Sequence, residues 1–268
     1  MKYLSNRISI LTLAYLFNIC NYQENNDKLN SIRDLIIFNN NAMLASNHSG
    51  GIFISYDEGH TWMKQSNATV KQLSIDTNGI LWGIDAWIGI HEPGYSRILY
   101  SKDSGKNWVQ HEFDIKTFYP VNIVSEQNST LRIKTNSEYT YELNGMDLNK
   151  DWNCIDSNES VRKHQGYYVS ESSLLIRETK INNDTLIQLN DISTCFGILI
   201  YKDSVFIAGG GTDNKAYFAS YSNKGSINRI EMGGFQALGI RMDKKNRIWI
   251  FGDGGLFVKN DQRLKKLF

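Results

Sequence analysis

The sequence predicts an all-β fold, a β-propeller built from four-stranded antiparallel blades. Three observations support this prediction: an octapeptide that occurs twice, short strand-like runs at the spacing of a repeat, and a composition suited to many tight turns. The 268 residues include 21 Gly, 14 Tyr, 12 Phe and 6 Trp, but only two Pro. Glycine and aromatic residues favour short strands joined by turns, and self-similarity at a fixed period is typical of propellers and solenoids.

The repeated octapeptide has the form Ser-x-Asp-x-Gly-x-(Thr/Asn)-Trp and begins at Ser55 and again 46 positions later at Ser101. Each residue type suits a tight turn, because Asp accepts hydrogen bonds from backbone N–H groups, Gly adopts positive φ, and Trp packs the turn onto its sheet. We therefore interpret the motif as structural rather than catalytic. Its structural residues are Ser55, Asp57, Gly59, Trp62, Ser101, Asp103, Gly105 and Trp108.

A degenerate third copy follows in the same register, where Asp147 and Trp152 keep their places and Asn replaces Gly. Residues 75–82 and 242–249 resemble each other as well, and both read as a strand, a polar turn and a second strand. A repeat of this length with four short strands fits one propeller blade. The chain divides into six such units: residues 32–67, 68–113, 118–157, 160–191, 195–231 and 235–268.

We therefore expect a single domain over residues 32–268 with six blades. The alternative is a seven-bladed ring that uses residues 8–31 as extra strands. A β-sandwich is disfavoured because it does not explain a turn that recurs at blade spacing.

The octapeptide resembles the Asp-box (BNR) repeat of sialidases, sortilin ectodomains and photosystem II assembly-factor-like repeat proteins, which are all β-propellers. In sialidases the resemblance would imply three arginines that hold the substrate carboxylate, one of them in an Arg-Ile-Pro motif, with a Tyr nucleophile and an Asp acid/base. This chain has Arg-Ile at Arg97, Arg132 and Arg247, and none is followed by Pro. The sialidase catalytic motif is therefore absent.

Candidate binding residues lie in an insertion in the second unit. The span between its second strand and its octapeptide is eight residues longer than in the first unit, and the excess falls within residues 85–97. In propellers such loops gather with the connections between blades on one face, near the mouth of the central channel. Aromatic residues and arginine favour binding hot spots, and His and Glu can titrate or hydrogen-bond. With one carboxylate from the Gly-rich loop 252–255, the predicted binding residues are Trp87, His91, Glu92, Tyr95, Arg97 and Asp253.

The predicted function is a non-catalytic module that binds a protein or a glycan, such as an assembly factor, an inhibitor or an immunity-type partner, and that is monomeric by itself. A net charge of +1 gives no support for nucleic-acid binding. Neither a cofactor nor a metal site is predicted, because the five histidines lack the spacing of metal ligands. The alternative is a glycoside hydrolase or lyase whose carboxylates come from Asp85, Glu92 and Asp253.

The N-terminus predicts export. Lys2 and Arg7 precede a mostly apolar run over residues 8–19, which is typical of a signal peptide ending near residue 20 and is too short to span a bilayer. A polar segment, residues 21–31, follows. We expect the protein in a bacterial periplasm, anchored at an outer membrane, or secreted.

The cysteines leave two questions open. Cys20 stands where a bacterial lipoprotein carries its acylated cysteine, but the residues before it lack the usual small side chains. Removal of the signal peptide would leave Cys154 and Cys195, an even pair that could form a disulfide or remain as thiols.

Overall fold

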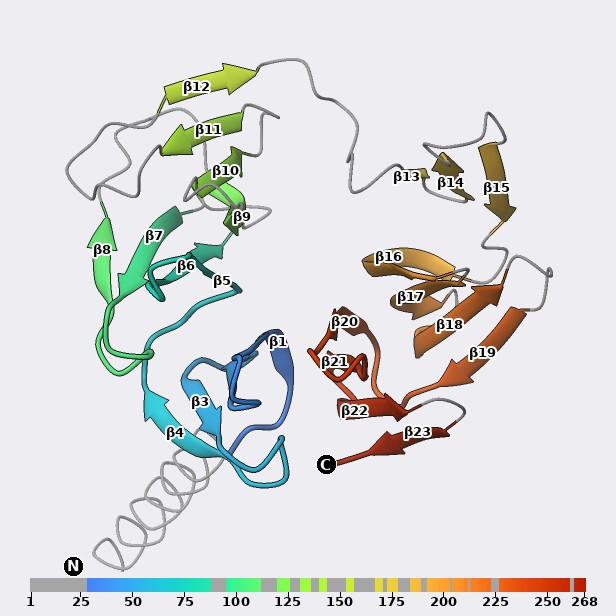
Figure 1. The fold of residues 1–268 in the computed structure, drawn as a ribbon, viewed down its shortest axis with the longest axis horizontal. Coiled ribbons are helices and arrows are strands. Elements are labelled where there is room, and N and C mark those ends of the chain that lie inside the picture. The colour runs from blue at the N-terminus through green and yellow to red at the C-terminus, as the bar shows by residue number, and fades with distance from the viewer. Residues whose placement is uncertain are drawn as a thin grey trace, which may run out of the picture.

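The structure, a computed structural model, describes residues 28–87, 95–111, 120–125, 131–135, 140–143, 153–156, 167–170, 173–177, 184–188, 192–202, 204–211, 213–222, 227–260 and 263–268. These residues form an all-β propeller of antiparallel sheets, arranged as a ring around a central axis (Figure 1). In each sheet the strands follow one another in the order of the sequence. The predicted fold class is therefore confirmed. Among the described residues, none forms a helix with the length and apolarity of a membrane span.

Two four-stranded blades come from the N-terminal part of the chain. The first blade contains β1 (Ile32–Ile37), β2 (Met43–Asn47), β3 (Ile52–Ser55) and β4 (Met63–Ser66). The second contains β5 (Gln72–Ile75), β6 (Leu81–Trp87), β7 (Tyr95–Ser101) and β8 (Val109–His111).

Two more four-stranded blades come from the C-terminal part. The penultimate blade contains β16 (Ile192–Tyr201), β17 (Ser204–Gly211), β18 (Ala216–Ser222) and β19 (Ile227–Glu231). The last blade contains β20 (Ala237–Met242), β21 (Ile248–Gly252), β22 (Gly255–Asn260) and β23 (Arg263–Lys266).

The middle of the chain contributes two further sheets. One has four strands, β9 (Pro120–Ser125), β10 (Leu131–Thr135), β11 (Thr140–Leu143) and β12 (Asn153–Asp156). The other has three, β13 (Tyr167–Ser170), β14 (Ser173–Arg177) and β15 (Asp184–Gln188).

The expected number of four-stranded blades is corrected by these sheets. The unit over residues 160–191 supplies only three described strands, so a ring of six four-stranded blades does not follow from the described residues. None of them supplies a seventh blade either. What is confirmed is the coarser statement, a propeller of four-stranded antiparallel blades, of which the first two and the last two are described most completely.

The core lies between the blades. In the first blade β2 and β3 are buried along their whole length, because both faces of the sheet are covered by neighbouring blades. The outer strand β23 is largely exposed, and the outer strand β4 is half-buried except at Met63. One apolar cluster joins the first and last blades and includes Met43, Trp249 and Leu256, and a second joins the first and second blades and includes Leu44 and Leu81. Packing of apolar faces between blades therefore stabilises the ring.

The two segments that resemble each other, residues 75–82 and 242–249, form the same turn between the first and second strands of their blades. Asp76 Oδ1 accepts hydrogen bonds from the backbone N–H groups of Asn78 and Ile80, and its Oδ2 accepts one from Trp82 Nε1 at 3.0 Å. Asp243 repeats this pattern with the N–H groups at positions 245 and 247 and with Trp249 Nε1 at 2.9 Å. Each buried Asp thus satisfies a turn and fixes a buried Trp.

The two octapeptides also form identical turns, which join the third and fourth strands. Ser55 Oγ donates to Asp57 Oδ1 at 2.8 Å and accepts from Gly59 N at 2.8 Å, while Asp57 accepts from the N–H and hydroxyl of Thr61. Trp62 Nε1 donates to the carbonyl of Gly59 at 3.0 Å. The residues from Ser101 to Trp108 repeat every one of these contacts, with Asn107 in place of Thr. Asp147 and Trp152, the degenerate third copy, lie outside the described residues.

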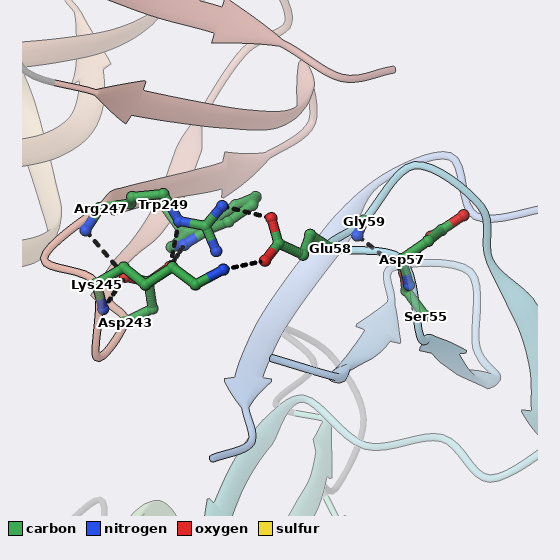
Figure 2. A network of polar contacts seen from close by, with 8 residues as sticks. All are labelled: Ser55, Asp57, Glu58, Gly59, Asp243, Lys245, Arg247 and Trp249. Carbon is green, nitrogen blue, oxygen red and sulfur yellow. Dashed lines mark hydrogen bonds and ion pairs between the residues drawn. The ribbon is translucent and has the colours of Figure 1, made fainter. Parts of the chain in front are cut away.

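An ionic clasp holds the first blade to the last at the octapeptide end of the ring. Glu58 accepts from Lys245 Nζ at 2.7 Å and from Arg247 Nη1, and Arg247 Nε also donates to Asp243 at 2.6 Å (Figure 2). The two hydrogen-bonded cations lower the pKa of Glu58 to about 2. In the described part of the chain each blade uses consecutive strands, so these two blades share no strand and their contact depends on side chains such as these.

Candidate functional site

The face opposite the octapeptide turns carries the turns between second and third strands and the connections between blades. Three backbone hydrogen bonds bring these segments together: His48 N donates to the carbonyl of Ser31, Gly51 N to that of Ala68, and Asp253 N to that of Gln236. We call this end of the propeller the mouth face. Antiparallel strands alternate in direction, so the octapeptide turns lie at the other end.

The insertion in the second blade forms a lengthened hairpin rather than a loop throughout residues 85–97. Strands β6 and β7 pair up to Trp87 opposite Tyr95, with Asp85 opposite Arg97. Trp87 and Tyr95 therefore face each other across the end of the hairpin, at backbone level. His91 and Glu92, which were predicted to belong to the same site, lie outside the described residues.

Asp85 is fully buried at the base of this hairpin. Its Oδ2 accepts a hydrogen bond from the half-exposed Arg97, whereas its Oδ1 has no hydrogen-bond partner among the described residues. Burying a carboxylate oxygen without a hydrogen bond costs free energy, and nearby cations offset part of that cost. Lys71 is one such cation, because the charge of Asp85 acts to raise its pKa.

Asp253 belongs to a polar bridge between the last and first blades. Its Oδ1 accepts from Ser31 Oγ at 2.9 Å, and the backbone N of Ser31 donates to Asn47 Oδ1 at 3.3 Å. The amide of buried Asn47 continues the bridge to Ser49 Oγ at 2.9 Å. Of the predicted binding residues with described side chains, Asp253 and Arg97 thus both lie on the mouth face, on different blades.

Three basic side chains stand beside these carboxylates. Arg33 is the extra residue of a bulge in β1, where the register with β2 shifts between Ile32 and Asp34. It is half-buried, and its Nε is buried without a hydrogen-bond partner among the described residues. Lys71 precedes β5, to which β1 is joined by a hydrogen bond from Leu73 N to Asp34 Oδ2 at 2.9 Å. The third is His48, in the turn that follows β2.

The charged side chains at this place act on one another. Burial lowers the pKa of Lys71, the nearby Arg33 lowers it further, and Asp85 opposes them. Burial, Arg33 and Lys71 lower the pKa of His48 in the same way, with Asp253 opposing. Both shifts favour the neutral forms, as expected where cations repel one another. We refer to Ser31, Arg33, His48, Lys71, Asp85 and Asp253 as the mouth cluster.

Arg33, His48 and Lys71 were missed as site residues by sequence reasoning. A signal did exist: Arg33-Asp34 and Lys71-Gln72 both place a cation before a hydrogen-bond acceptor in the inner strand. In the structure, Asp34 accepts from the next blade at Leu73 N, and Gln72 Oε1 accepts from the following sheet at Ile123 N. Alignment of the inner strands would have shown this repeat, which the longer octapeptide motif masked.

The described cysteines lie outside the mouth cluster. Cys154 lies on β12 and Cys195 on β16, in different sheets, and Cys195 Sγ is 3.8 Å from the carbonyl of Gly197. Cys20 lies outside the described residues. Within the described ranges, no three His, Cys, Asp or Glu side chains gather in a way that could hold a metal ion.

Comparisons with known proteins show the fold. The chain matches no protein-family model, and no curated protein matches it. Among solved structures it is similar to YCF48 bound to a D1 peptide, with a TM-score of 0.55 and 14% identity over 86% of this chain and 93% of that one. It is similar to a gluconolactonase from Xanthomonas campestris, with a TM-score of 0.53 and 12% identity over 87% of this chain and 86% of that one.

A third similar structure is the SapL1 lectin in complex with alpha methyl fucoside, with a TM-score of 0.50 and 13% identity over 90% of this chain and 97% of that one. These three proteins differ in what they bind or do, and all are far below the identity at which a function transfers. The chain is therefore a β-propeller, and these similarities show its fold alone.

Proposed function

We propose that this protein is a binding module that presents the mouth face of a rigid propeller to a macromolecular partner. The observation that carries the proposal is the mouth cluster, in which Arg33 and Lys71 lie close together with a buried, unpartnered Nε and a lowered lysine pKa. Such cations gain stability when a partner supplies a carboxylate or another hydrogen-bond acceptor. Propellers that bind a peptide or a sugar, as YCF48 and SapL1 do, are precedents for this use of the fold.

The rigidity of the face supports the same proposal. Asp34 joins three blades, because it accepts from Arg241 in the last blade at 2.7 Å and from Leu73 in the second blade at 2.9 Å. The polar bridge from Asp253 to Ser31 adds a further contact across the ring closure. A preorganised surface loses little conformational entropy when a partner binds.

We also propose that the chain is an Asp-box propeller. The two identical octapeptide turns support this finer assignment. An experimental structure would test it, and turns of a different form at Ser55 and Ser101 would contradict it.

Capture of a partner tests the binding function. We would immobilise the full chain, expose it to an envelope extract of the source cell and identify captured proteins by mass spectrometry. The double variant Arg33→Glu/Lys71→Glu is expected to lose a specific partner that the unmodified chain retains. The matched control Arg263→Glu/Lys265→Glu has the same charge change on the exposed outer strand β23 and is expected to keep it. Equal capture by both variants would contradict the proposal.

Export is proposed on the N-terminal pattern of Lys2, Arg7 and the apolar run over residues 8–19. Cell fractionation and N-terminal sequencing of the mature protein would test it, with a new N-terminus expected near Cys20. Loss of membrane association in Cys20→Ser would support lipidation. An unprocessed cytoplasmic protein would contradict export.

A further inference from the structure

We propose that the mouth face binds an acidic protein segment that also carries an apolar side chain, with the carboxylate at Arg33 and Lys71 and the apolar side chain at Phe235. This inference rests on the proposed binding function and specifies its ligand. It combines two features of the mouth face on opposite sides of Asp253.

The acidic half of the ligand is specified by Arg33 and Lys71. Both are half-buried, so each has already lost part of its hydration, and neither forms an ion pair with a carboxylate of the described residues. Arg33 keeps a buried Nε without an acceptor in the described part of the chain. A carboxylate can accept two hydrogen bonds from a guanidinium in one plane, which satisfies that geometry better than a neutral carbonyl does.

The apolar half is specified by Phe235 in the connection between the penultimate and last blades. Its side chain is 70% exposed, although it lies in an anchored segment. Met232 N donates to the carbonyl of Ala216, Ala216 N donates to that of Gly234, and the side chain of Met232 is buried. An exposed aromatic side chain on an anchored connection can contact a partner with little loss of conformational entropy.

Gly234 holds this connection against the turn that carries Asp253. A Cβ at Gly234 would lie 2.7 Å from Gly254 N and 2.8 Å from Asp253 C, so the two backbones approach closely at a position with φ of +76°. Phe235 is therefore held next to the turn that carries Asp253, and Asp253 accepts a hydrogen bond from Ser31 of the mouth cluster. Phe196, 42% exposed at the bulge of β16, adds apolar surface in the adjacent blade.

The arrangement favours an extended peptide over a sugar. The aromatic side chain lies where the penultimate and last blades meet, while the cations lie on the first and second blades, so a ligand has to cross the end of the last blade. A peptide presents an acidic and an apolar side chain at such a separation, and phenylalanine and arginine are enriched in protein interfaces. The cations of this site lie in the half formed by Arg33 and Lys71, so the acidic side chain of the segment is expected there rather than beside Phe235.

Selection from a library of random peptides displayed on phage tests the inference with the full chain as bait. Enriched peptides are expected to combine Asp or Glu with an aromatic or large aliphatic residue, and to bind more weakly as salt increases. Synthetic peptides from the enriched set should lose at least about tenfold in affinity to Arg33→Gln/Lys71→Gln and to Phe235→Ala, as hot-spot truncations do. The control Arg263→Gln/Lys265→Gln should bind them unchanged, and melting curves should show that all variants are folded.

Enrichment of peptides without an acidic residue, or equal affinity for the Arg33→Gln/Lys71→Gln variant, would overturn the inference. Binding of an acidic oligosaccharide in place of any peptide would overturn it as well. Any of these outcomes could occur together with capture of a protein partner that still depends on Arg33 and Lys71. In that case the binding function would stand, and only the proposed ligand class would be wrong. If neither peptide binding nor partner capture depended on Arg33 and Lys71, the binding function and the ligand class would both be refuted.

Discussion

At the scale of single residues, the octapeptide glycines are constrained by the neighbouring blade as well as by their own turn. Gly59 has a φ of +84°, and a Cβ there would lie 2.8 Å from Leu256 Cδ2 of the last blade. Gly105 has a φ of +88°, and its Cβ would lie 3.3 Å from Leu44 Cδ1 of the first blade. The positive φ is a property of the turn, whereas the close contact exists only because blades pack on one another.

A pair of alanine substitutions separates these two effects. Gly79 has a φ of +79°, and a Cβ there would have no atom of a described, non-adjacent residue within 4 Å, so Gly79→Ala is expected to lose only the backbone preference, about 1 kcal/mol. Gly59→Ala adds overpacking against Leu256 and is expected to lose a further ~1–3 kcal/mol. Denaturant unfolding measures both. Equal losses would mean that the octapeptide turn does not pack against the last blade as described.

At the scale of elements, the turn between the first and second strands is organised by one buried carboxylate. Asp76 and Asp243 each accept from two backbone N–H groups and one indole, so the same residue closes the turn and holds a buried Trp. In the octapeptide turn, by contrast, the bonds of Asp57 to Thr61 are exposed to solvent.

The two aspartates are therefore expected to differ in importance. Asp76→Ala leaves Trp82 Nε1 and two N–H groups without acceptors, and we expect a loss of about 3 kcal/mol, since Asp76 and Trp82 are both buried. Asp57→Ala should lose less, because water replaces the carboxylate at the exposed turn. Urea midpoints of the two variants give the comparison. A larger loss for Asp57→Ala would contradict this ranking.

At the scale of the whole molecule, the described strands close the ring without one that the first and last blades share. Apolar packing between Met43, Trp249 and Leu256 joins the two blades, and the ionic clasp adds charged hydrogen bonds at the octapeptide end. Asp34 and Ser31 add polar contacts at other points of the same interface. Closure is therefore sensitive to acid at Glu58, where two cations meet one carboxylate.

Glu58→Gln is expected to weaken closure at neutral pH and to change its acid dependence. The pKa of Glu58 is lowered from 4.5 to about 2, so its ionised form stabilises the fold above pH 4.5, and that contribution is lost as pH falls toward 2. We expect a loss of about 1 kcal/mol at pH 7 after solvent screening, and a difference between variant and parent that shrinks as pH falls through about 2 and vanishes below it. Thermal unfolding across pH measures it.

Glu231→Gln is the matched control for the clasp. It removes an exposed pair with Lys215 at 2.8 Å that lies within the penultimate blade. We expect this change to have little effect on stability at any pH. If both variants behaved alike, the clasp would be no more than a surface ion pair.

Ligand binding is expected to strengthen as pH falls from 7.5 toward the pKa of His48. Burial, Arg33 and Lys71 hold that pKa below 6.5 in the free protein, against the attraction of Asp253. A bound carboxylate raises it, so binding takes up a proton, and by linkage the affinity rises by roughly two- to tenfold. Calorimetry in buffers of different ionisation enthalpy measures the proton uptake. His48→Gln should abolish the pH dependence, and a pH-independent affinity of the parent would exclude this role.

The sequence alone determined the repeat. Hydrogen bonding within the octapeptide is local, from Ser55 to Trp62, so residue types at fixed spacing were sufficient to predict the turn and, through its period, a propeller of four-stranded antiparallel blades. The resemblance between residues 75–82 and 242–249 likewise reflects bonds within one turn. The sequence predicted a loop where the second blade forms a hairpin. A strand that extends beyond its neighbours has the same kind of residues as a loop, so its sequence does not distinguish the two.

Tertiary structure decided which residues meet. Arg33, Lys71, His48 and Asp253 are separated by up to most of the chain, and they lie together because radial closure brings the first, second and last blades side by side. The partner of Glu58 in the last blade has the same origin. Local patterns specify turns and strands, whereas the charge that one blade presents to another depends on the ring, which no short stretch of sequence encodes.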